Sequence, residues 1–279
     1  MRVYLNGAYV DEAEATVSID DRAFLFADGV YEVVHIYGGK PFEWERHMAR
    51  LARSLQGIEI EGISPTDLLE PRDRLLAEFS ADEGALYIQI SRGVQKRSHA
   101  PPAAGHITPT VLMWIRPVEP IATDVVQRGV TMITTPDDRW AKVWIKTVGL
   151  LPNVLAKGKA IRRGAFDAIF VRDGVVTEAT AANVFRVAGG IIQTAPVTNY
   201  ILPGITRAVV IELARELGYP VVEEPFTVDE LMASDEVFIT GTLTEVLPVT
   251  EIDGVRFGDG AGPVSLRLWN ALKQRTRQG

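Results

Sequence analysis

The chain has 279 residues, which is enough for roughly two domains of about 150 residues with well-packed cores. Hydrophobic residues make up 47% and charged residues 23%, and this ordinary globular composition argues against a disordered chain or a fibrous repeat. The formal net charge of -7 has the wrong sign for binding phosphate backbones, so we expect no nucleic acid partner.

The residue types that the chain lacks, or has few of, exclude several kinds of site. There are no cysteines, which rules out disulfides, thiol nucleophiles, iron–sulfur clusters and cysteine-bound zinc. The four histidines, at positions 35, 47, 99 and 106, show no metal-ligand spacing, so we expect no metal. No apolar run is long enough for a signal peptide or a membrane span, which predicts no membrane partner and a place in the cytoplasm.

The first half of the chain predicts hairpins and two helices, the second of them at 68–79, followed by two further strands. Asn6-Gly7, between β-rich flanks, is typical of a two-residue hairpin turn. Residues 29–37 are β-branched and aromatic, which predicts a strand, and residues 48–55 place apolar side chains at helical spacing. Residues 86–92 alternate as a half-buried strand does, and residues 110–115 close this half.

A domain boundary is predicted where two prolines lie close together, because they end a strand and stiffen the connection. Pro117 and Pro120 therefore separate an N-terminal α+β domain, 1–117, from a C-terminal domain, 122–279, with a linker at 118–121. In chain order the second half predicts two strands, a helix, two hairpin turns and another helix, at 130–134, 141–146, 152–161, 173–174, 189–190 and 204–217. Hairpins mixed with helices favour the α+β fold class over a doubly wound sheet.

Lys146 is the most distinctive candidate for chemistry, since the chain has no Walker loop, no Gly-x-Ser-x-Gly elbow and no strand-anchored Gly-x-Gly-x-x-Gly. Of the seven lysines, it alone ends an apolar strand, Val143–Ile145. Partial desolvation there favours the neutral amine that forms a Schiff base. The alternative is an ordinary strand-end lysine whose ammonium group reaches water.

Three further features could bind charged groups. Glu178 lies among small residues between apolar strands. A carboxylate that is buried there needs a cationic partner, such as a protonated pyridine nitrogen. The alternative is a glutamate that is solvated at a strand end. The segment Gly204-Ile205-Thr206 offers backbone amides at a helix start, and Arg50 offers a planar guanidinium, so both suit a phosphate. Arg50 could instead share a solvated helix face with Arg46 and Arg53.

Six motifs that follow one another along the chain carry a family resemblance. They are Asp28–Glu32, Glu45–Leu51, Ile145–Lys146 with Leu150–Lys157, Thr177–Ala179 with Asn183–Phe185, Leu202–Arg207, and Thr242 with Thr244–Glu245. From about residue 3 to about residue 272 the chain resembles the class IV, pyridoxal-phosphate-dependent aminotransferases. The resemblance implies an α+β, two-domain enzyme of fold type IV, with a smaller N-terminal α/β domain and a larger, mixed and barrel-like C-terminal domain that binds pyridoxal 5'-phosphate.

The resemblance also implies roles for the residues that match the family's motifs. Lys146 would hold the cofactor as a Schiff base and then act as the base that moves the substrate's α-proton, while Glu178 would keep the pyridine nitrogen protonated. The remaining cofactor contacts would anchor the phosphate or pack behind the ring: Arg50, Ile205, Thr206 and Thr242 for the phosphate, and Leu202 for the ring.

The substrate pocket decides among the branches of this family, which include branched-chain L-amino-acid aminotransferases, aminodeoxychorismate lyases, R-selective amine transaminases and D-amino-acid aminotransferases. Arg97-Ser-His99 is similar to the D-amino-acid pattern, in which an Arg-x-His pair and the tyrosine corresponding to Tyr31 trap the substrate carboxylate. An arginine can hold a carboxylate through two parallel hydrogen bonds. By itself, an Arg-x-His sequence is typical of a surface loop.

The resemblance therefore implies a ping-pong transaminase that moves the amino group of a D-amino acid, such as D-alanine, to a 2-oxo acid, such as 2-oxoglutarate. In the family the residues matching Arg97 and His99 reach the neighbouring subunit, which implies a homodimer. The other branches of the family, and a ligand-binding protein without catalysis, are the alternatives. The chain has Ala181, Ala182 and Gly241 where hydroxyl side chains are common in the family, which puts its relative activity and substrate range in question.

Overall fold

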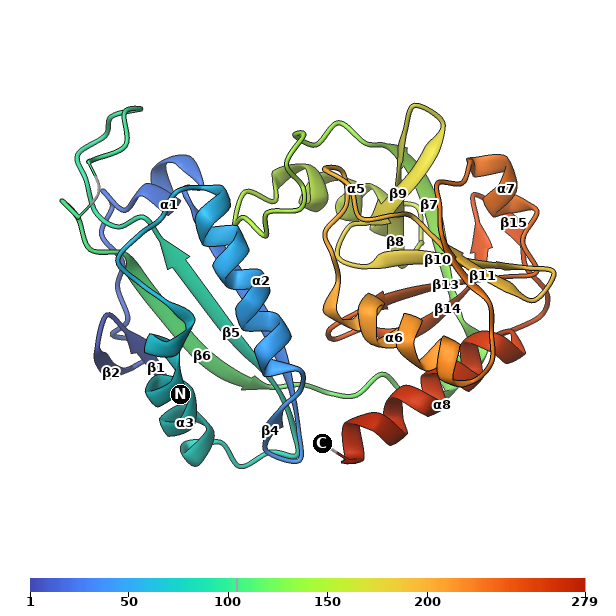
Figure 1. Cartoon of the computed structure of the whole chain (residues 1–279), viewed down its shortest axis with the longest axis horizontal. Helices are drawn as coiled ribbons and strands as arrows, with labels where there is room; N and C mark the ends of the chain where they lie inside the picture. The colour runs from blue at the N-terminus through green and yellow to red at the C-terminus, as the bar shows by residue number, and fades with distance from the viewer. Residues whose placement is uncertain (104, 279) are drawn as a thin grey trace. The chain divides into compact units, whose positions relative to one another are not determined.

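The computed structural model describes residues 1–103 and 105–278 (Figure 1). These residues form two compact units, each with its own sheet and helices. The first unit holds Met1–Glu119 together with Ile145–Gly149, and the second holds Pro120–Trp144 together with the chain from Leu150 onward. Since both units combine helices with largely hairpin-connected strands, the predicted α+β fold class is confirmed.

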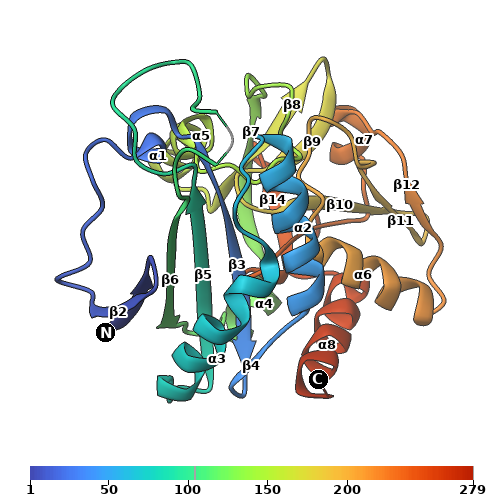
Figure 2. The same ribbon diagram turned by 60° about the vertical axis from the view of Figure 1, so that its left-hand side comes forward.

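The first unit is built on a six-stranded antiparallel sheet in the order β2-β1-β6-β5-β3-β4 (Figure 2). Its strands are β1 (Arg2–Leu5), β2 (Ala8–Asp11), β3 (Gly29–Tyr37), β4 (Lys40–Pro41), β5 (Glu83–Ser91) and β6 (Thr110–Pro117). Asn6-Gly7 links β1 to β2 as predicted, and Gly38-Gly39 links β3 to β4. All four turn residues have positive φ, which Asn and Gly adopt at little cost.

Four helical segments complete the first unit. They are α1 (Arg22–Phe26), α2 (Trp44–Gly57), the 3-10 helix η1 (Pro65–Leu68) and α3 (Leu69–Glu78). The predicted helical spacing is confirmed in α2, which packs against β3 and buries Met48, Leu51 and Leu55. Each such side chain contributes about 1.5–3 kcal/mol when fully buried, so this apolar face holds α2 firmly on the sheet.

The second unit contains a nine-stranded mixed sheet in the order β12-β11-β10-β13-β14-β7-β8-β9, with β15 paired to β14. Its strands are β7 (Val130–Pro136), β8 (Asp167–Arg172), β9 (Val175–Ala179), β10 (Asn183–Ala188), β11 (Ile191–Thr194), β12 (Val221–Glu223), β13 (Glu236–Gly241), β14 (Glu245–Ile252) and β15 (Val255–Arg256). The predicted turns at 173–174 and 189–190 join antiparallel hairpins. The sheet curls so that its last strand, β9, lies beside β10, and Ala179 N donates to Ala182 O at 2.7 Å. This curled sheet confirms the expected barrel-like character of the domain.

Helices pack around this sheet and enclose an aromatic and aliphatic core. They are α4 (Thr123–Arg128), α5 (Leu151–Arg162), α6 (Ile205–Glu216), α7 (Val228–Met232) and α8 (Pro263–Gln278). Within the sheet, Phe185 of β10 lies opposite Phe238 of β13, and their stacked rings have centroids 4.9 Å apart. Both rings are fully buried, so this pair fixes the centre of the sheet against the helices.

The predicted strand at 141–146 is wrong. Residues 141–145 form turns and a bend instead of a ladder. Val143 and Ile145 are buried as the apolar pattern suggests, but their backbone groups pair singly with different partners: Val143 N donates to Asn199 O at 2.8 Å, and Thr147 N donates to Ile145 O at 2.9 Å. A run of only three apolar residues is too short to distinguish a strand from a buried turn.

Replacing Phe238 with Ala should lower the free energy of unfolding by about 3–5 kcal/mol, because the change removes a fully buried ring and leaves a cavity. Val255→Ala is a control in the same sheet, since Val255 is 44% exposed, and should change the free energy by less than about 0.5 kcal/mol. Urea denaturation followed by tryptophan fluorescence measures both variants. Equal effects of the two substitutions would contradict the role given to the phenylalanine pair.

Candidate active site

Lys146 belongs to the first unit, where backbone hydrogen bonds hold it beside β3 and α2. Its carbonyl accepts a hydrogen bond from Tyr31 N at 3.0 Å, and its amide N–H donates to Ser54 Oγ at 3.1 Å. Two residues later, Val148 N donates to Gly29 O at 3.1 Å. The backbone of Lys146 is therefore fixed by the start of β3 and by α2, although it has no strand of its own.

The side chain of Lys146 meets an aromatic ring. Its Nζ lies 4.2 Å from the centroid of the Tyr31 ring, which is a cation–π distance. Within the described residues, 1–103 and 105–278, no carboxylate forms an ion pair with this amine. The amine can therefore react with a carbonyl group without first breaking an ion pair.

Arg50 is buried on α2 and holds Glu32 of β3 through two hydrogen bonds. Its Nε and Nη2 donate to the two carboxylate oxygens of Glu32, each at 2.8 Å, and His47 Nδ1 lies 2.8 Å from Glu32 Oε2. Burial raises the pKa of Glu32, but the charge and hydrogen bonds of Arg50 outweigh it and lower this pKa to about 2. Burial lowers the pKa of His47, so Glu32 and Arg50 carry the charges of this network.

The alternative that placed Arg50 on a solvated face is wrong. The side chain of Arg50 is 3% exposed, whereas that of Arg46 is 40% exposed and Arg53 is also exposed. The three arginines follow helical spacing, but Glu32 reaches Arg50 from β3 and buries it. Helical periodicity alone contains no information about which residue a neighbouring strand will cover.

Sequence reasoning gave Glu32 no role, although a signal was present. Glu32 alternates with Val30 and Val34 in the predicted strand, and all three side chains point to one face. Both valines are fully buried, and Glu32 is buried with them. A charged residue in the middle of an apolar strand face needs a partner, and that partner is Arg50.

Glu178 lies in β9 of the second unit and is buried, so the alternative of a solvated strand-end glutamate is wrong. Arg139 Nη1 donates to Glu178 Oε1 at 2.5 Å, while Leu202 N and Asn183 Nδ2 donate to Oε2 at 2.9 and 3.2 Å. Burial has the largest effect and raises the pKa of Glu178, although Arg139 acts in the opposite direction. The carboxylate is thus more basic than an ordinary glutamate and suited to a proton-bearing partner.

Arg139 is shared between two carboxylates, and sequence reasoning missed it. Its Nε and Nη2 each donate to one oxygen of Asp137 at 2.9 Å, and Thr177 Oγ1 donates to Asp137 Oδ2 at the same distance. Burial raises the pKa of Asp137, but the hydrogen bonds and charge of Arg139 outweigh it and lower this pKa. Asp137 therefore orients the guanidinium that reaches Glu178.

The predicted helix start at Gly204-Ile205-Thr206 is confirmed, because α6 begins at Ile205 with Gly204 as its N-cap. Among the residues that the structure describes, no side chain caps this end, so the first turn of α6 can offer its amides to another acceptor. A Cβ on Gly204 would lie 2.1 Å from Asn183 Oδ1, and Asn183 Nδ2 also donates to Leu202 O at 3.0 Å. Asn183 therefore positions Leu202 and the N-terminus of α6 together.

The departure from the family at Gly241 has a steric explanation. Gly241 ends β13 and directly precedes the half-buried Thr242. A Cβ on Gly241 would lie 3.2 Å from both Ala181 O and Thr244 Oγ1, which is too close without movement of these groups. The small residue at 241 therefore matches the backbone at Ala181. Ala182 is buried in the hydrophobic core of the second unit, where a hydroxyl would need a hydrogen-bond partner.

The structure brings together two of the three residues predicted to bind the substrate carboxylate. Arg97 and His99 are exposed in the loop after β5, and both lie beside the ring of Phe26: the guanidinium is 5.2 Å and the imidazole centroid 5.5 Å from its centroid. Tyr31, the third residue, stacks on Tyr87 at 5.8 Å. Among the residues that the structure describes, no hydrogen bond or ring contact joins Tyr31 to Arg97 or His99.

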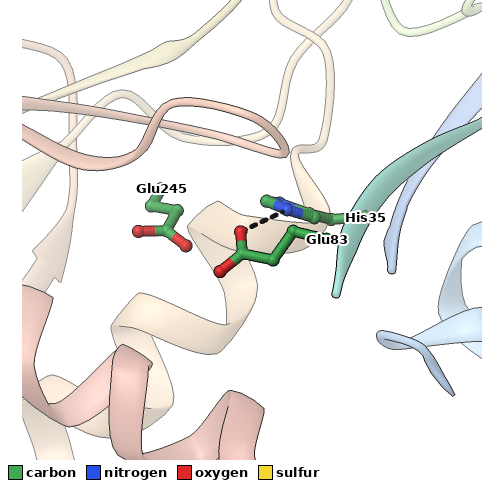
Figure 3. Close-up of side chains that lie close together, drawn as sticks. All are labelled: His35, Glu83 and Glu245. Carbon is green, nitrogen blue, oxygen red and sulfur yellow. Dashed lines mark hydrogen bonds and ion pairs between the residues drawn. The ribbon is translucent and has the colours of Figure 1, made fainter. Parts of the chain in front are cut away.

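His35, like His47, is buried beside a carboxylate. Figure 3 shows His35 Nε2 hydrogen-bonded to Glu83 Oε2, and the two atoms are 3.0 Å apart. The ring of His35 also stacks on Tyr37 at 3.9 Å.

None of the helices in the described residues combines the length and the apolar character that a membrane span requires.

Comparison with known proteins shows which family the chain resembles along its length. The family model described as "Amino-transferase class IV" matches residues 29–252. A D-alanine aminotransferase of Bacillus licheniformis is 42% identical over 275 residues, which cover 98% of this chain and 96% of that protein. A D-alanine aminotransferase of Listeria monocytogenes is 41% identical over 271 residues, which cover 96% of this chain and 93% of that protein.

Solved structures agree in fold. The branched-chain amino acid aminotransferase of Escherichia coli has a TM-score of 0.91 at 26% identity, with 98% of this chain and 93% of that chain covered. The T.th. branched-chain amino acid aminotransferase with pyridoxamine 5'-phosphate has a TM-score of 0.89 at 29% identity, with 99% and 93% covered. The family model spans most of the sequence, and the relatives match nearly all of it. This chain belongs to the class IV aminotransferases.

Proposed function

We propose that this chain transfers the amino group of a D-amino acid, such as D-alanine, to a 2-oxo acid, such as 2-oxoglutarate. The observation that carries the proposal is the 42% identity to a D-alanine aminotransferase over 98% of the chain. As a class IV aminotransferase the chain is a pyridoxal-phosphate-dependent enzyme, and one of the similar structures contains pyridoxamine 5'-phosphate. We place the reaction in the cytoplasm and assign it a ping-pong order, in which the first product leaves before the second substrate binds.

The residues present fit this cofactor. Pyridoxal phosphate, when bound, supplies an aldehyde that bonds to an amine, a ring that accepts electrons and a phosphate dianion. Lys146 offers an amine without a carboxylate partner in the described chain, and Glu178 offers a buried carboxylate whose pKa is raised. The uncapped first turn of α6 and the guanidinium of Arg50 are suited to the phosphate.

Lys146 and Glu178 would handle the protons of the reaction. Lys146 would hold the cofactor through its amine, and the same amine would act as the base that moves the proton of the substrate's α-carbon. Glu178 would accept a hydrogen bond from the protonated ring nitrogen of the cofactor and so keep the positive charge there. Arg139 and Asn183 keep the Glu178 carboxylate aimed in one direction.

The phosphate would be anchored by donors whose positions are set by other side chains. Arg50 is oriented by Glu32, and the amides of Ile205 and Thr206 are fixed at the start of α6. Thr242 would add a hydroxyl, and Leu202 would pack behind the ring. The bond from Arg50 to Glu32 and the first turn of α6 are each formed without the cofactor, so these two groups would lose little conformational entropy on binding.

The hand of the substrate would be set by the position of its carboxylate. We assign this carboxylate to Tyr31, Arg97 and His99, with Arg97 and His99 acting on the neighbouring subunit of a homodimer. A guanidinium holds a carboxylate through two hydrogen bonds and thereby fixes its plane. The similarity to branched-chain amino acid aminotransferases, up to a TM-score of 0.91, makes an L-amino-acid transaminase the second candidate.

A coupled assay with D-alanine and 2-oxoglutarate tests the proposal. We expect pyruvate to form at a rate that depends on pyridoxal phosphate, and we expect Lys146→Ala to lower kcat by at least about a thousandfold, because both the covalent link and the proton-transferring base are lost. Lys142→Ala is the control, since Lys142 is exposed four residues away, and it should keep the wild-type rate. Wild-type turnover by Lys146→Ala, or turnover of L-leucine in place of D-alanine, would contradict the proposal.

Glu32→Gln should weaken both the fold and the cofactor site, because it leaves the buried Arg50 without its counter-charge. We expect the free energy of unfolding to fall by about 3–5 kcal/mol and the Kd for pyridoxal phosphate to rise by about tenfold. Glu43→Gln is the control at the start of the same helix, since Glu43 pairs with the exposed Arg46 and should cost less than about 1 kcal/mol. Fluorescence titration and urea denaturation measure the two quantities.

The same substitution gives a pH dependence with a defined sign. The pKa of Glu32 is about 2 in the folded chain, below its ordinary value of 4.5, so the stabilisation by Glu32 is present above pH 4.5 and is lost as the pH falls through 2. The difference in stability between the wild type and Glu32→Gln should therefore shrink over this range. A difference that stays constant down to pH 2 would show that Glu32 is not ionised in the folded protein.

A further inference from the structure

The loop after β5 is tied to α1 before it reaches Arg97 and His99 (Figure 2). Arg22 N donates to Gly93 O at 3.0 Å, and Gln95 N donates to Asp20 O at 3.1 Å. A Cβ on Gly93 would lie 2.2 Å from Thr108 O, so the two ends of the loop also approach each other closely. The backbone of the loop thus leaves the sheet along a path that the α1 segment sets.

The side chain of Arg22 also binds the loop, between the two candidate carboxylate-binding residues Arg97 and His99. Arg22 is 4% exposed, and its Nη1 donates to Gln95 Oε1 at 3.1 Å and to Ser98 O at 2.8 Å. Ser98 is the residue between Arg97 and His99. The hydrogen bond to its carbonyl therefore fixes the backbone between these two residues.

Arg22 is itself held in place by a carboxylate. Its Nε donates to Asp28 Oδ2 at 2.8 Å, and Arg92 donates to both oxygens of Asp28, at 2.8 and 3.0 Å. Burial raises the pKa of Asp28, but the hydrogen bonds and charges of Arg92 and Arg22 outweigh it and lower this pKa. Asp28 is thus ionised and directs the guanidinium of Arg22 toward the loop.

Phe26, at the end of α1, provides the second attachment. The guanidinium of Arg97 lies 5.2 Å from the centroid of the Phe26 ring, and the imidazole centroid of His99 lies at 5.5 Å. The guanidinium of Arg22 lies 4.9 Å from the same centroid. One ring therefore contacts both candidate carboxylate-binding side chains as well as the residue that fixes the peptide between them.

We propose that Arg22 and Phe26 are positioning residues for the recognition of the substrate carboxylate. Arg22 fixes the backbone between Arg97 and His99, and Phe26 limits the directions that the two side chains can take. This inference rests on the proposed function, because it takes Arg97 and His99 as the groups that bind the carboxylate. Neither positioning residue contacts the reacting atoms, so their loss weakens substrate binding more than it slows the chemical step.

Steady-state kinetics of Phe26→Leu and Arg22→Lys, with D-alanine and 2-oxoglutarate, test the inference. Both substrates carry a carboxylate next to the reacting carbon, so we expect the KM of each to rise about five- to tenfold in both variants, with kcat within about twofold of the wild type. Phe26→Tyr keeps an aromatic ring and should restore KM to near the wild-type value. Tyr219→Leu is the control for the loss of an aromatic ring beside a guanidinium, because the Tyr219 ring lies 5.6 Å from the guanidinium of Arg267 in the second unit.

Two further readouts separate positioning from a general structural role. The Tm and the visible absorption band of the bound cofactor should be unchanged in Phe26→Leu. An unchanged KM, or a fall in kcat, Tm and cofactor band without a rise in KM, would overturn the inference. A wild-type enzyme that is inactive with D-amino acids would overturn the proposed function and this inference with it, whereas an active wild type with unaffected variants would overturn only the inference.

Discussion

The ion pair of Glu32 and Arg50 is the interaction on which the site of the first unit depends. A buried carboxylate without a partner would cost several kcal/mol, and the two hydrogen bonds from Arg50 offset this cost. The pair joins β3 to α2 at the point where both elements hold Lys146. Tyr31, which binds the carbonyl of Lys146, is next to Glu32, and Ser54, which binds its amide, is one turn beyond Arg50. The pair that compensates a buried charge therefore also fixes the two elements that hold the backbone of Lys146.

The second unit also buries a carboxylate, that of Glu178, and compensates its charge through a different arrangement of partners. Glu178 is buried in β9 and needs a cation, and Arg139 supplies it while Asp137 holds Arg139 from the other side. Burial raises the pKa of Glu178, and Arg139, which also holds Asp137, offsets this effect only in part. At Asp137 the hydrogen bonds and charge of Arg139 outweigh burial, and the pKa is lowered. This asymmetry leaves Glu178 suited to a second positive group, such as the protonated ring nitrogen of the proposed cofactor.

Local sequence patterns predicted much of the secondary structure up to α6, but none of the elements after it, which include β13, β14 and α8. The positive φ values at Asn6-Gly7 follow from residue type, and the strand at 29–37 and the apolar face of α2 follow from periodicity. The prediction failed at 141–146, where a short apolar run is buried in turns. No local pattern indicated that Ile145–Gly149 would pack with the first unit, because that packing depends on hydrogen bonds to residues more than 90 positions away.

The candidate site could be predicted only for residues with an unusual local setting. Lys146 and Glu178 were singled out from neighbours that suggested desolvation, and Glu178 is indeed buried. Their supporting residues were missed. Arg139 lies in an irregular segment, and the partner of Glu32 is 18 positions away on another element, so neither pairing leaves a periodic signal. Family resemblance supplied the roles of Arg97 and His99, but it did not show that Phe26 and Arg22 hold them.

The central claim is that this chain binds pyridoxal phosphate through Lys146 and accepts the amino group of a D-amino acid. The most direct test is the visible absorption spectrum of the purified protein, recorded before and after the addition of D-alanine alone and, in a second sample, L-leucine alone. We predict that the yellow band of the lysine-bound cofactor disappears with D-alanine and persists with L-leucine. Loss of the band with L-leucine only, or the absence of any band after pyridoxal phosphate is added, would contradict the claim.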